Sequence, residues 1–441
     1  MKNISMSSKI GFWSVFALVT SSQIGTGVFM LPASLASFGK FGLIGWIISG
    51  GGAISLALIF AKLCSEFPRT GGPHVYVHKA FGPTFAFFVG WTYWLISWVS
   101  TTAVVITSVT YLAPFISNQD NTTYLALEII LLLIVTGLNL RGIKAAGSVE
   151  ILLTLLKFTP LLLLSIVSLY YFDSNNIVVA QDVSALPTQQ ILGRVTLLTL
   201  WGFIGLESAT TPASSVKDAH KTIPRAIIFG TISVALLYFI NSVALMGLIP
   251  AKSLALSKAP YVDAAGIIFG GNWHLLISFV AAIICVGTLN AWIIASSQIA
   301  LGLAEDGLMP KIFAKKNKRN APSFSIITSC VGIVPLLILT SATNISQQIT
   351  TIINFSVVAF LFVYLSCCFA FLKLIRTTSG RSKSAYYMYS IVAISFCLWV
   401  VSETSLTTLM VASLFVCSGL PLYLFWYRKQ ITGVILSDKI E

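Results

Sequence analysis

The sequence has few charged residues: Asp, Glu, Lys and Arg make up 9% of its 441 residues, whereas hydrophobic residues make up 56%. A soluble domain carries roughly a quarter charged residues, so this chain lacks the polar surface that a water-soluble fold requires. The longest stretches outside apolar runs, at about 172–189 and 305–322, are too short to fold by themselves. The composition therefore excludes a separate soluble domain.

Cysteine and histidine are too sparse to indicate a metal site. The four histidines are scattered, and the seven cysteines lie in or beside apolar segments without CxxC spacing. We expect buried, unpaired cysteines, neither metal nor cofactor, and no enzyme activity. The net charge of +13 does not indicate nucleic acid, because no basic stripe with interleaved aromatic residues accompanies it.

Long apolar runs recur along the whole chain, and each is long enough to cross about 30 Å of hydrocarbon. They predict an all-α polytopic membrane protein with twelve transmembrane helices. The third helix is too long for a perpendicular span and should be tilted. The predicted helices lie at about 12–37, 41–63, 81–115, 124–141, 147–171, 190–213, 225–248, 274–304, 323–342, 350–373, 385–402 and 406–427.

The basic residues are distributed unevenly between the two sides of these helices. Of the 27 Lys and Arg residues, 22 fall on the side of the N-terminus, three (Lys40, Lys252 and Lys258) fall on the other side, and two lie inside apolar segments. Basic residues are retained in the cytoplasm, so this bias predicts that both termini are cytoplasmic. It also supports the even number of helices, because a missed span would disturb the alternation.

Two of the predicted helices carry glycines at mid-membrane: Gly25 and Gly27 flank Thr26 in the first, and Gly202 and Gly205 lie in the sixth. Each glycine weakens a helix by roughly 1 kcal/mol relative to alanine. Broken helices at corresponding positions of two repeats indicate a transporter's binding site, where the N-terminus of a half-helix points at a substrate carboxylate. The alternative is that these glycines only permit close helix packing.

The matching breaks in the first and sixth helices predict a transport core at 1–373, built from two five-helix inverted repeats at about 12–171 and 190–373. The segment 385–427 then supplies two additional helices.

Two ionisable residues lie inside predicted helices. Glu207 follows the second break by about one turn, and it is a candidate for proton exchange or for pairing with a substrate cation. The alternative is that the Glu207 carboxyl group only makes a structural hydrogen bond to the unwound backbone. The ammonium of Lys157 could replace a bound cation beside the break in the first helix, or could extend along the helix to the interface.

Four aromatic residues, Trp201, Trp292, Tyr93 and Tyr364, occur at mid-helix, away from the interfaces where aromatic belts lie. Such rings can close over a substrate and stack on an amine, although each one alone is as readily explained by core packing. His74 lies in the predicted loop before the third helix, where it is either a pH sensor or a solvated loop residue.

Four motifs resemble those of the amino acid–polyamine–organocation transporter superfamily, and most closely its basic amino acid and polyamine antiporters, such as the arginine/agmatine and putrescine/ornithine exchangers. The motifs are Ile24-Gly25-Thr26-Gly27-Val28-Phe29 with Leu31-Pro32, Gly71-Gly72 leading to Ala80-Phe81-Gly82-Pro83, Leu200-Trp201-Gly202-Phe203-Ile204-Gly205-Leu206-Glu207-Ser208-Ala209, and Ala304-Glu305-Asp306-Gly307-Leu308-Met309-Pro310.

The resemblance implies a five-plus-five inverted-repeat fold with two extra helices, alternating access and a homodimer. It assigns the substrate carboxylate to the backbone of Ile24, Gly25, Thr26 and Gly27, and the substrate side chain to Trp201, Ile204 and Trp292. It implies gates or a proton-sensitive layer at Tyr93, Glu207 and Tyr364.

The chain departs from the arginine exchangers at two places. Where they carry an asparagine that contacts substrate, this chain has Ser100-Thr101. Lys157 is foreign to those exchangers, but it is similar to the helix-five lysine of proton-coupled relatives.

The sequence therefore predicts a secondary transporter of the plasma (inner) membrane that works as an antiporter of cationic amino acids or their decarboxylated amines. The alternative is a proton-coupled symporter of neutral amino acids that uses Lys157. A channel is disfavoured, because continuous rings of polar residues along a pore are missing from the sequence.

Overall fold

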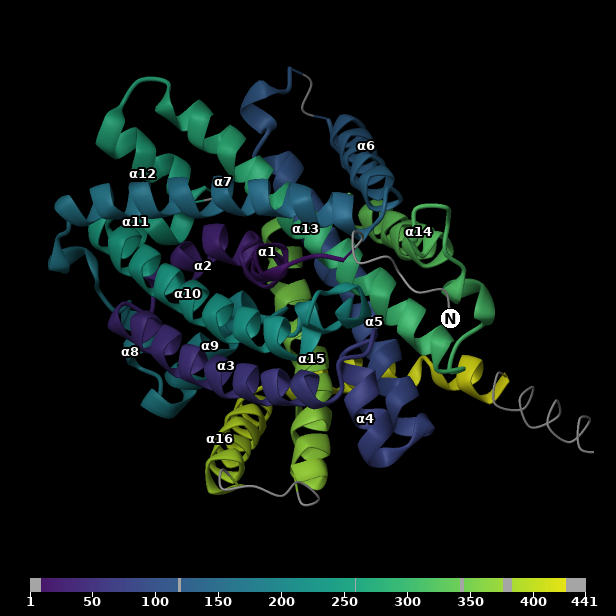
Figure 1. Cartoon of the computed structure of the whole chain (residues 1–441). Helices are drawn as coiled ribbons and strands as arrows, with labels where there is room; N and C mark the ends of the chain where they lie inside the picture. The colour runs from purple at the N-terminus through teal and green to yellow at the C-terminus, as the bar shows by residue number, and fades with distance from the viewer. Residues whose placement is uncertain (1–8, 118–119, 258, 342–344, 376–382, 426–441) are drawn as a thin grey trace, which may run out of the picture.

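The computed structural model describes residues 9–117, 120–257, 259–341, 345–375 and 383–425, and it is a bundle of helices (Figure 1). Within these residues the β-type pairing consists of one isolated bridge, between Ile10 and Val216. Twelve helical segments are long and apolar enough to cross a membrane. This confirms the prediction of an all-α polytopic membrane protein with twelve spans.

The spans alternate with a few short helices. The first five are α1 (Phe12–Gln23) with α2 (Thr26–Ala36), α3 (Lys40–Glu66), α5 (Pro83–Thr110), α6 (Asn121–Asn139) and α7 (Ile143–Tyr170). The next five are α9 (Thr188–Leu200) with the 3₁₀ turns that follow it, α10 (Ala219–Leu248), α13 (Trp273–Glu305), α14 (Ser323–Thr340) and α15 (Ile345–Ile375). The last two are α16 (Lys383–Ser402) and α17 (Leu406–Cys417); the short helices are α4 (Pro73–Phe81), α8 (Gln181–Ser184), α11 (Ala251–Leu256) and α12 (Pro260–Phe269).

Several boundaries differ from the prediction. The helix predicted at 81–115 is divided at Gly82, whose φ of +88° separates α4 from α5, and it ends in a 3₁₀ turn at Ala113–Phe115. Cys417 is exposed rather than buried. The last two residues of the helix predicted at 406–427 lie outside the described residues. The inverted repeat and the division into 1–373 and 385–427 stay predictions.

Both segments with predicted breaks are interrupted. In the first, α1 ends at Gln23 and α2 begins at Thr26, with extended backbone at Ile24. In the sixth, α9 gives way to 3₁₀ turns, and Gly205 has a φ of +103°, a conformation that favours glycine. α1 lies in the middle of the bundle between α7 and α10 (Figure 1), and it also packs against α13. The first break is therefore enclosed by protein.

The two interrupted segments are joined at one side of the bundle, which we call the N-terminal side because the first span begins there and the sixth span ends there. The Ile10 N–H donates to the Ser215 carbonyl at 3.0 Å, and the Lys217 N–H donates to the Ile10 carbonyl at 2.9 Å. The residue before α1 is thus paired with the chain that follows the sixth span.

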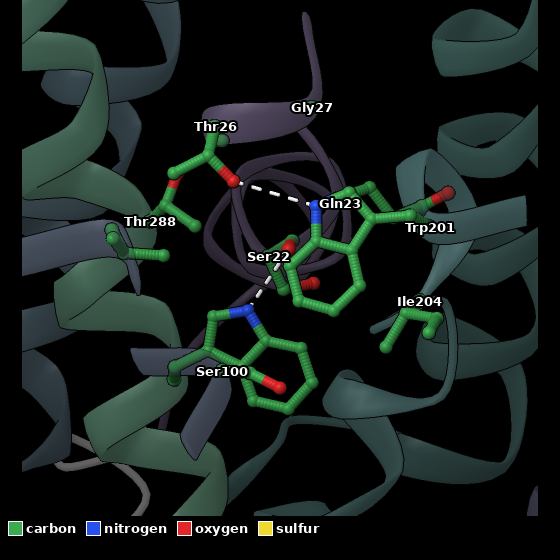
Figure 2. A pocket seen from close by; sticks show the side chains of 11 residues that line it. Ser22, Gln23, Thr26, Gly27, Ser100, Trp201, Ile204 and Thr288 are labelled. Carbon is green, nitrogen blue, oxygen red and sulfur yellow. Dashed lines mark hydrogen bonds between the residues drawn. The ribbon is translucent and has the colours of Figure 1, made fainter. Parts of the chain in front are cut away.

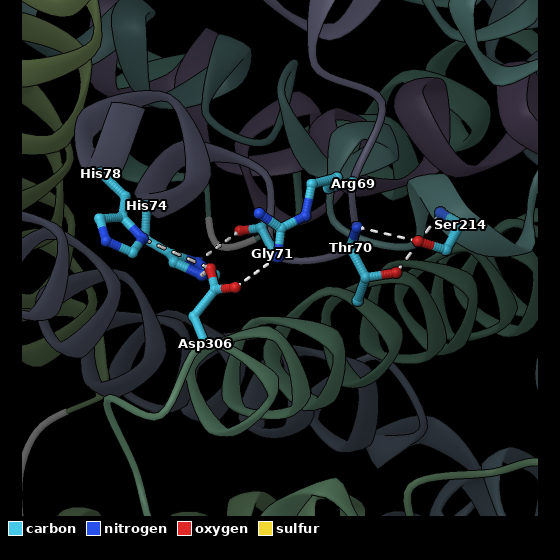
Figure 3. A network of polar contacts seen from close by, with 7 residues as sticks. All are labelled: Arg69, Thr70, Gly71, His74, His78, Ser214 and Asp306. Atoms are coloured by element: carbon cyan, nitrogen blue, oxygen red, sulfur yellow. Dashed lines mark hydrogen bonds and ion pairs between the residues drawn. The ribbon is translucent and has the colours of Figure 1, made fainter. Parts of the chain in front are cut away.

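A second contact on the N-terminal side centres on Asp306, which follows α13 (Figure 3). Its Oδ1 accepts a hydrogen bond from Arg69 Nη2 at 2.5 Å, and its Oδ2 lies 3.3 Å from His74 Nε2 and 3.8 Å from His78 Nδ1. The expectation that His74 belongs to a loop is wrong: it lies in α4 and is fully buried. The cluster joins α4 and the loop before it to the end of α13.

The charge of Asp306 is stabilised by its neighbours. Burial alone would raise the pKa of Asp306, but the hydrogen bonds and charges of His74 and Arg69 outweigh burial and lower the pKa from 3.8 to about 2. The pKa of Asp306 in the folded protein lies below its ordinary value. The ionised carboxylate therefore adds to the free energy of unfolding above about pH 4, and this contribution is lost as the pH falls toward 2.

We expect Asp306→Asn to lower the free energy of unfolding by about 1–2 kcal/mol near pH 7, because Arg69 loses its charged partner. The thermal midpoint of the purified protein in detergent, measured from pH 7 down to pH 2, should show the difference between variant and parent shrinking below about pH 4. The matched control is Glu305→Gln, whose partner Lys316 lies 3.0 Å away at an exposed site. Equal changes in the thermal midpoint for Asp306→Asn and Glu305→Gln would contradict the stabilising role of the buried Asp306 contacts.

Candidate functional site

A pocket lies where the two interrupted spans meet (Figure 2). Its free space is about 20 Å³, which is room for about one water. None of its described lining residues carries a formal charge. The lining comes from α1, α2, α5, α13 and the interrupted stretch after α9: Ser22, Gln23, Gly25, Thr26, Gly27, Ser100, Val104, Trp201, Ile204, Thr288 and Trp292.

Most of the residues predicted to bind substrate line this pocket, and their role in binding stays a prediction. The two exceptions are Ile24 and Thr101, which are buried outside the lining. Sequence reasoning missed Ser22, Gln23, Val104 and Thr288. The first two adjoin the predicted break and could have been included with it. Thr288 is a polar residue in the middle of an apolar helix, which is a weak signal without its partners.

The carbonyl groups released at the end of α1 accept hydrogen bonds from side chains of other helices. Four successive carbonyls are satisfied in this way: Ser21 by Lys157 Nζ (3.0 Å), Ser22 by Trp292 Nε1 (3.1 Å), Gln23 by the Tyr238 hydroxyl (2.7 Å), and Ile24 by Thr288 Oγ1 (2.6 Å) and Lys157 Nζ (3.0 Å). The donors belong to α7, α10 and α13, so side chains of three helices supply the hydrogen bonds that the break needs inside the membrane.

The other side of the break presents donors instead of acceptors. α2 begins at Thr26 with no side-chain cap from the described residues, so the N–H groups of its first turn have no acceptor within the helix. The positive end of the helix dipole lies at the same place. At Gly25, an added Cβ would lie 2.7 Å from Thr288 Cγ2, so the close approach of α13 requires glycine. Uncapped N–H groups beside a pocket make a site for a carboxylate.

Hydrogen bonds also cross the pocket between the two interrupted spans. Trp201 Nε1 donates to Thr26 Oγ1 at 3.4 Å, as Figure 2 shows. The Ser22 hydroxyl lies 2.8 Å from both the Gly205 carbonyl and the Ser208 hydroxyl. The Trp201 side chain thus closes the pocket against α2 and leaves little space inside.

The three residues predicted as gates form a buried layer next to the pocket without lining it. The Tyr364 hydroxyl donates to Glu207 Oε2 at 2.6 Å, while Glu207 Oε1 has no hydrogen-bond partner among the described residues. The Tyr93 ring lies 6.2 Å from Trp292 and 5.4 Å from Phe360, measured between ring centres. Trp292 therefore belongs to both the pocket and the layer. His74 is in neither, since it contacts Asp306.

Lys157 is fully buried at the first break. Besides the carbonyls of Ser21 and Ile24, its ammonium contacts Thr288 Oγ1 at 2.8 Å and the Ser21 hydroxyl. The alternative in which Lys157 extends to the interface is therefore wrong. The other alternative, in which its ammonium replaces a bound cation beside the break, stays a prediction.

The amino-acid sequence matches those of known transporters. The chain is 29% identical over 343 residues to the cadaverine/lysine antiporter of Escherichia coli (strain K12), covering 77% of each chain. It is 28% identical over 360 residues to the putrescine transporter PotE of Haemophilus influenzae, covering 81% of this chain and 83% of the relative. A family model described as amino acid permease matches residues 10–435. As its resemblance to the amino acid–polyamine–organocation superfamily predicts, the chain belongs to the amino acid permease family.

Proposed function

We propose that this protein exchanges a cationic amino acid for a small amine, such as its decarboxylation product, across the membrane. The observation that carries the proposal is the uncapped N-terminus of α2, which meets two tryptophans at one pocket. The names of the relatives support the substrate class, since they are a cadaverine/lysine antiporter and a putrescine transporter.

The binding mode follows from the free polar groups around the pocket. The substrate carboxylate binds the N–H groups of Thr26 and Gly27, and the α-ammonium binds Gln23 Oε1, which has no partner among the described residues. The aliphatic chain lies between Trp201 and Trp292. The distal ammonium points toward the free oxygen of Glu207 in the buried layer. The diamine formed by decarboxylation lacks only the carboxylate, so it keeps the last three of these contacts.

The transport cycle requires the pocket to enlarge, because about 20 Å³ cannot hold an amino acid. Movement of Trp201 away from Thr26 opens it on one side, and movement of the Tyr93, Glu207 and Tyr364 layer opens it on the other. Within this proposal the two halves are inverted repeats, the N-terminal side faces the cytoplasm, and the protein resides in the plasma (inner) membrane. Association into a homodimer stays a prediction.

A second candidate function is proton-coupled uptake of an amino acid. The position of Lys157 favours it, because this ammonium donates to carbonyls on the break itself. Loss of its proton would remove a donor from the backbone that forms the pocket. Lys157 would then link proton binding to the shape of the site.

We expect liposomes containing the purified protein and preloaded with cadaverine or putrescine to take up labelled lysine or ornithine. Liposomes without internal substrate should take up much less, because an exchanger returns through the membrane only when loaded. The measurement is the initial rate of counterflow, with and without a pH gradient, and alanine is the control substrate.

Two outcomes would overturn the proposed exchange of a cationic amino acid for an amine. Uptake into empty liposomes that is driven by a pH gradient and lost in Lys157→Ala would replace the exchanger by the proton-coupled candidate. The absence of counterflow for lysine, ornithine, cadaverine, putrescine and alanine would contradict amino acid transport itself.

We also expect Glu207→Gln to weaken the binding of lysine and cadaverine by roughly ten- to a hundredfold, because a charge-assisted hydrogen bond contributes about 1.5–3 kcal/mol. The affinity for alanine should stay within about twofold, since alanine has no distal ammonium. Equilibrium binding to the purified protein measures both, and Glu207→Asp, which keeps the charge, should recover part of the loss. An equal loss for alanine would show that Glu207 acts only through packing.

A further inference from the structure

A second buried carboxyl group, Glu150 on α7, lies outside the pocket and outside the layer beside it. Its side chain is fully buried. Asn290 Nδ2 donates to Glu150 Oε2, whereas Glu150 Oε1 has no hydrogen-bond partner among the described residues. A buried carboxyl oxygen without a donor is unfavourable unless a positive charge or a proton is close by.

Lys157, which is seven residues further along α7, can supply both a positive charge and a proton to Glu150. Seven residues are close to two turns, so both side chains leave the same face of α7, about 10 Å apart along its axis. The two groups interact electrostatically. The Ser21 side chain accepts a hydrogen bond from Lys157, and it also interacts with the Glu150 carboxyl group. One hydroxyl therefore stands between the ammonium and the carboxyl group.

Polar contacts continue from Glu150 toward the N-terminal side. Asn290 Oδ1 accepts a hydrogen bond from Asn139 Nδ2 at 3.0 Å, and Asn139 is the last residue of α6. Asn139 also lines a small cavity together with Ser297 and Gln298 of α13. Its free space of about 10 Å³ is close to what one water needs. Polar groups thus extend from the first break to a cavity near the end of α6.

Few other titratable groups lie near this chain of contacts. α7 packs against α1, α6, α10, α12 and α13. α1 has no titratable side chain. The described titratable residues of the other four helices are Tyr124 and Glu128 (α6), His220, Lys221, Arg225 and Tyr238 (α10), Tyr261 and Asp263 (α12), and His274, Cys285 and Glu305 (α13). Of these, Cys285 interacts with Lys157.

We propose that Glu150 exchanges a proton with Lys157 through the Ser21 hydroxyl and releases it toward the N-terminal side. An N–H bond of the ammonium breaks and its proton passes to Ser21 Oγ, while the Ser21 hydroxyl turns toward Glu150 Oε1 and its own proton passes to that oxygen. The pair changes from ammonium and carboxylate to amine and carboxylic acid, so no net charge is created in the membrane. The carboxylic acid then gives its proton to water that reaches it from the N-terminal side, where the cavity beside Asn139 lies.

The proton transfer changes the first break. As an ammonium, Lys157 has three N–H groups for the carbonyls of Ser21 and Ile24 and for the neighbouring hydroxyls. As an amine it has two, and the Ser21 hydroxyl then donates to the amine nitrogen, so the contact between Lys157 and Ser21 at the end of α1 reverses its direction. This inference rests on the proton-coupled candidate of the proposed function, and it adds the residue through which the proton arrives.

The test uses Glu150→Gln, which keeps the size of the side chain and an acceptor for Asn290 but cannot take a proton. We expect substrate-for-substrate exchange in preloaded liposomes to stay within about twofold of the parent, while proton movement, reported by a trapped pH-sensitive dye, falls by roughly a hundredfold. Glu150→Asp should restore part of it. The matched control is Glu128→Gln, which removes another buried carboxyl group of the spans. Proton movement at the parental rate in Glu150→Gln would overturn the proposal.

A second measurement needs no substrate. In infrared spectra recorded against pH, the carboxylic acid band of Glu150 should be absent from Glu150→Gln, and the pH at which it appears should move by about one unit or more in Lys157→Met. A band that titrates identically in the parent and in Lys157→Met would overturn the proposal. Lack of transport of every tested amine and amino acid would contradict the proposed function alone, because the infrared result would still decide between proton exchange and a structural carboxyl group.

Discussion

A carbonyl oxygen that leaves a helix inside a bilayer needs a hydrogen-bond donor, because the hydrocarbon supplies none. In this protein the end of α1 releases four such oxygens in succession, and Lys157, Trp292, Tyr238 and Thr288 supply the donors. The same contacts position the pocket, since they orient Trp292 and draw α13 against Gly25. The break, its partners and the pocket are therefore parts of one arrangement.

The pocket itself is neutral, and the buried charges lie around it. Lys157 contacts the backbone of the break from one direction, and Glu207 lies in the adjoining layer of tyrosines. Neither charged group lines the small cavity, whose polar groups come from the backbone and from neutral side chains.

The sequence is sufficient to predict the spans and the two breaks, because hydropathy and glycine act locally. Trp201 was found because it adjoins a break. The sequence does not indicate Glu150 and Thr288, because their hydrogen-bond partners Asn290 and Ile24 lie 140 and 264 residues away in the chain and only folding brings them together. The residues Gly71, Gly72 and Pro73 indicate a turn and so predict a loop at His74, whereas Pro73 begins α4 and His74 is buried in that helix.

The pairing of Ile10 with Ser215 and Lys217 has a mechanical consequence. Two backbone hydrogen bonds join the chain before α1 to the chain after the sixth span, and the helix of each span is interrupted at its own break. The portions of both spans on the N-terminal side are thereby attached to each other. A displacement of one portion therefore strains its bonds to the other, so the two breaks are mechanically coupled.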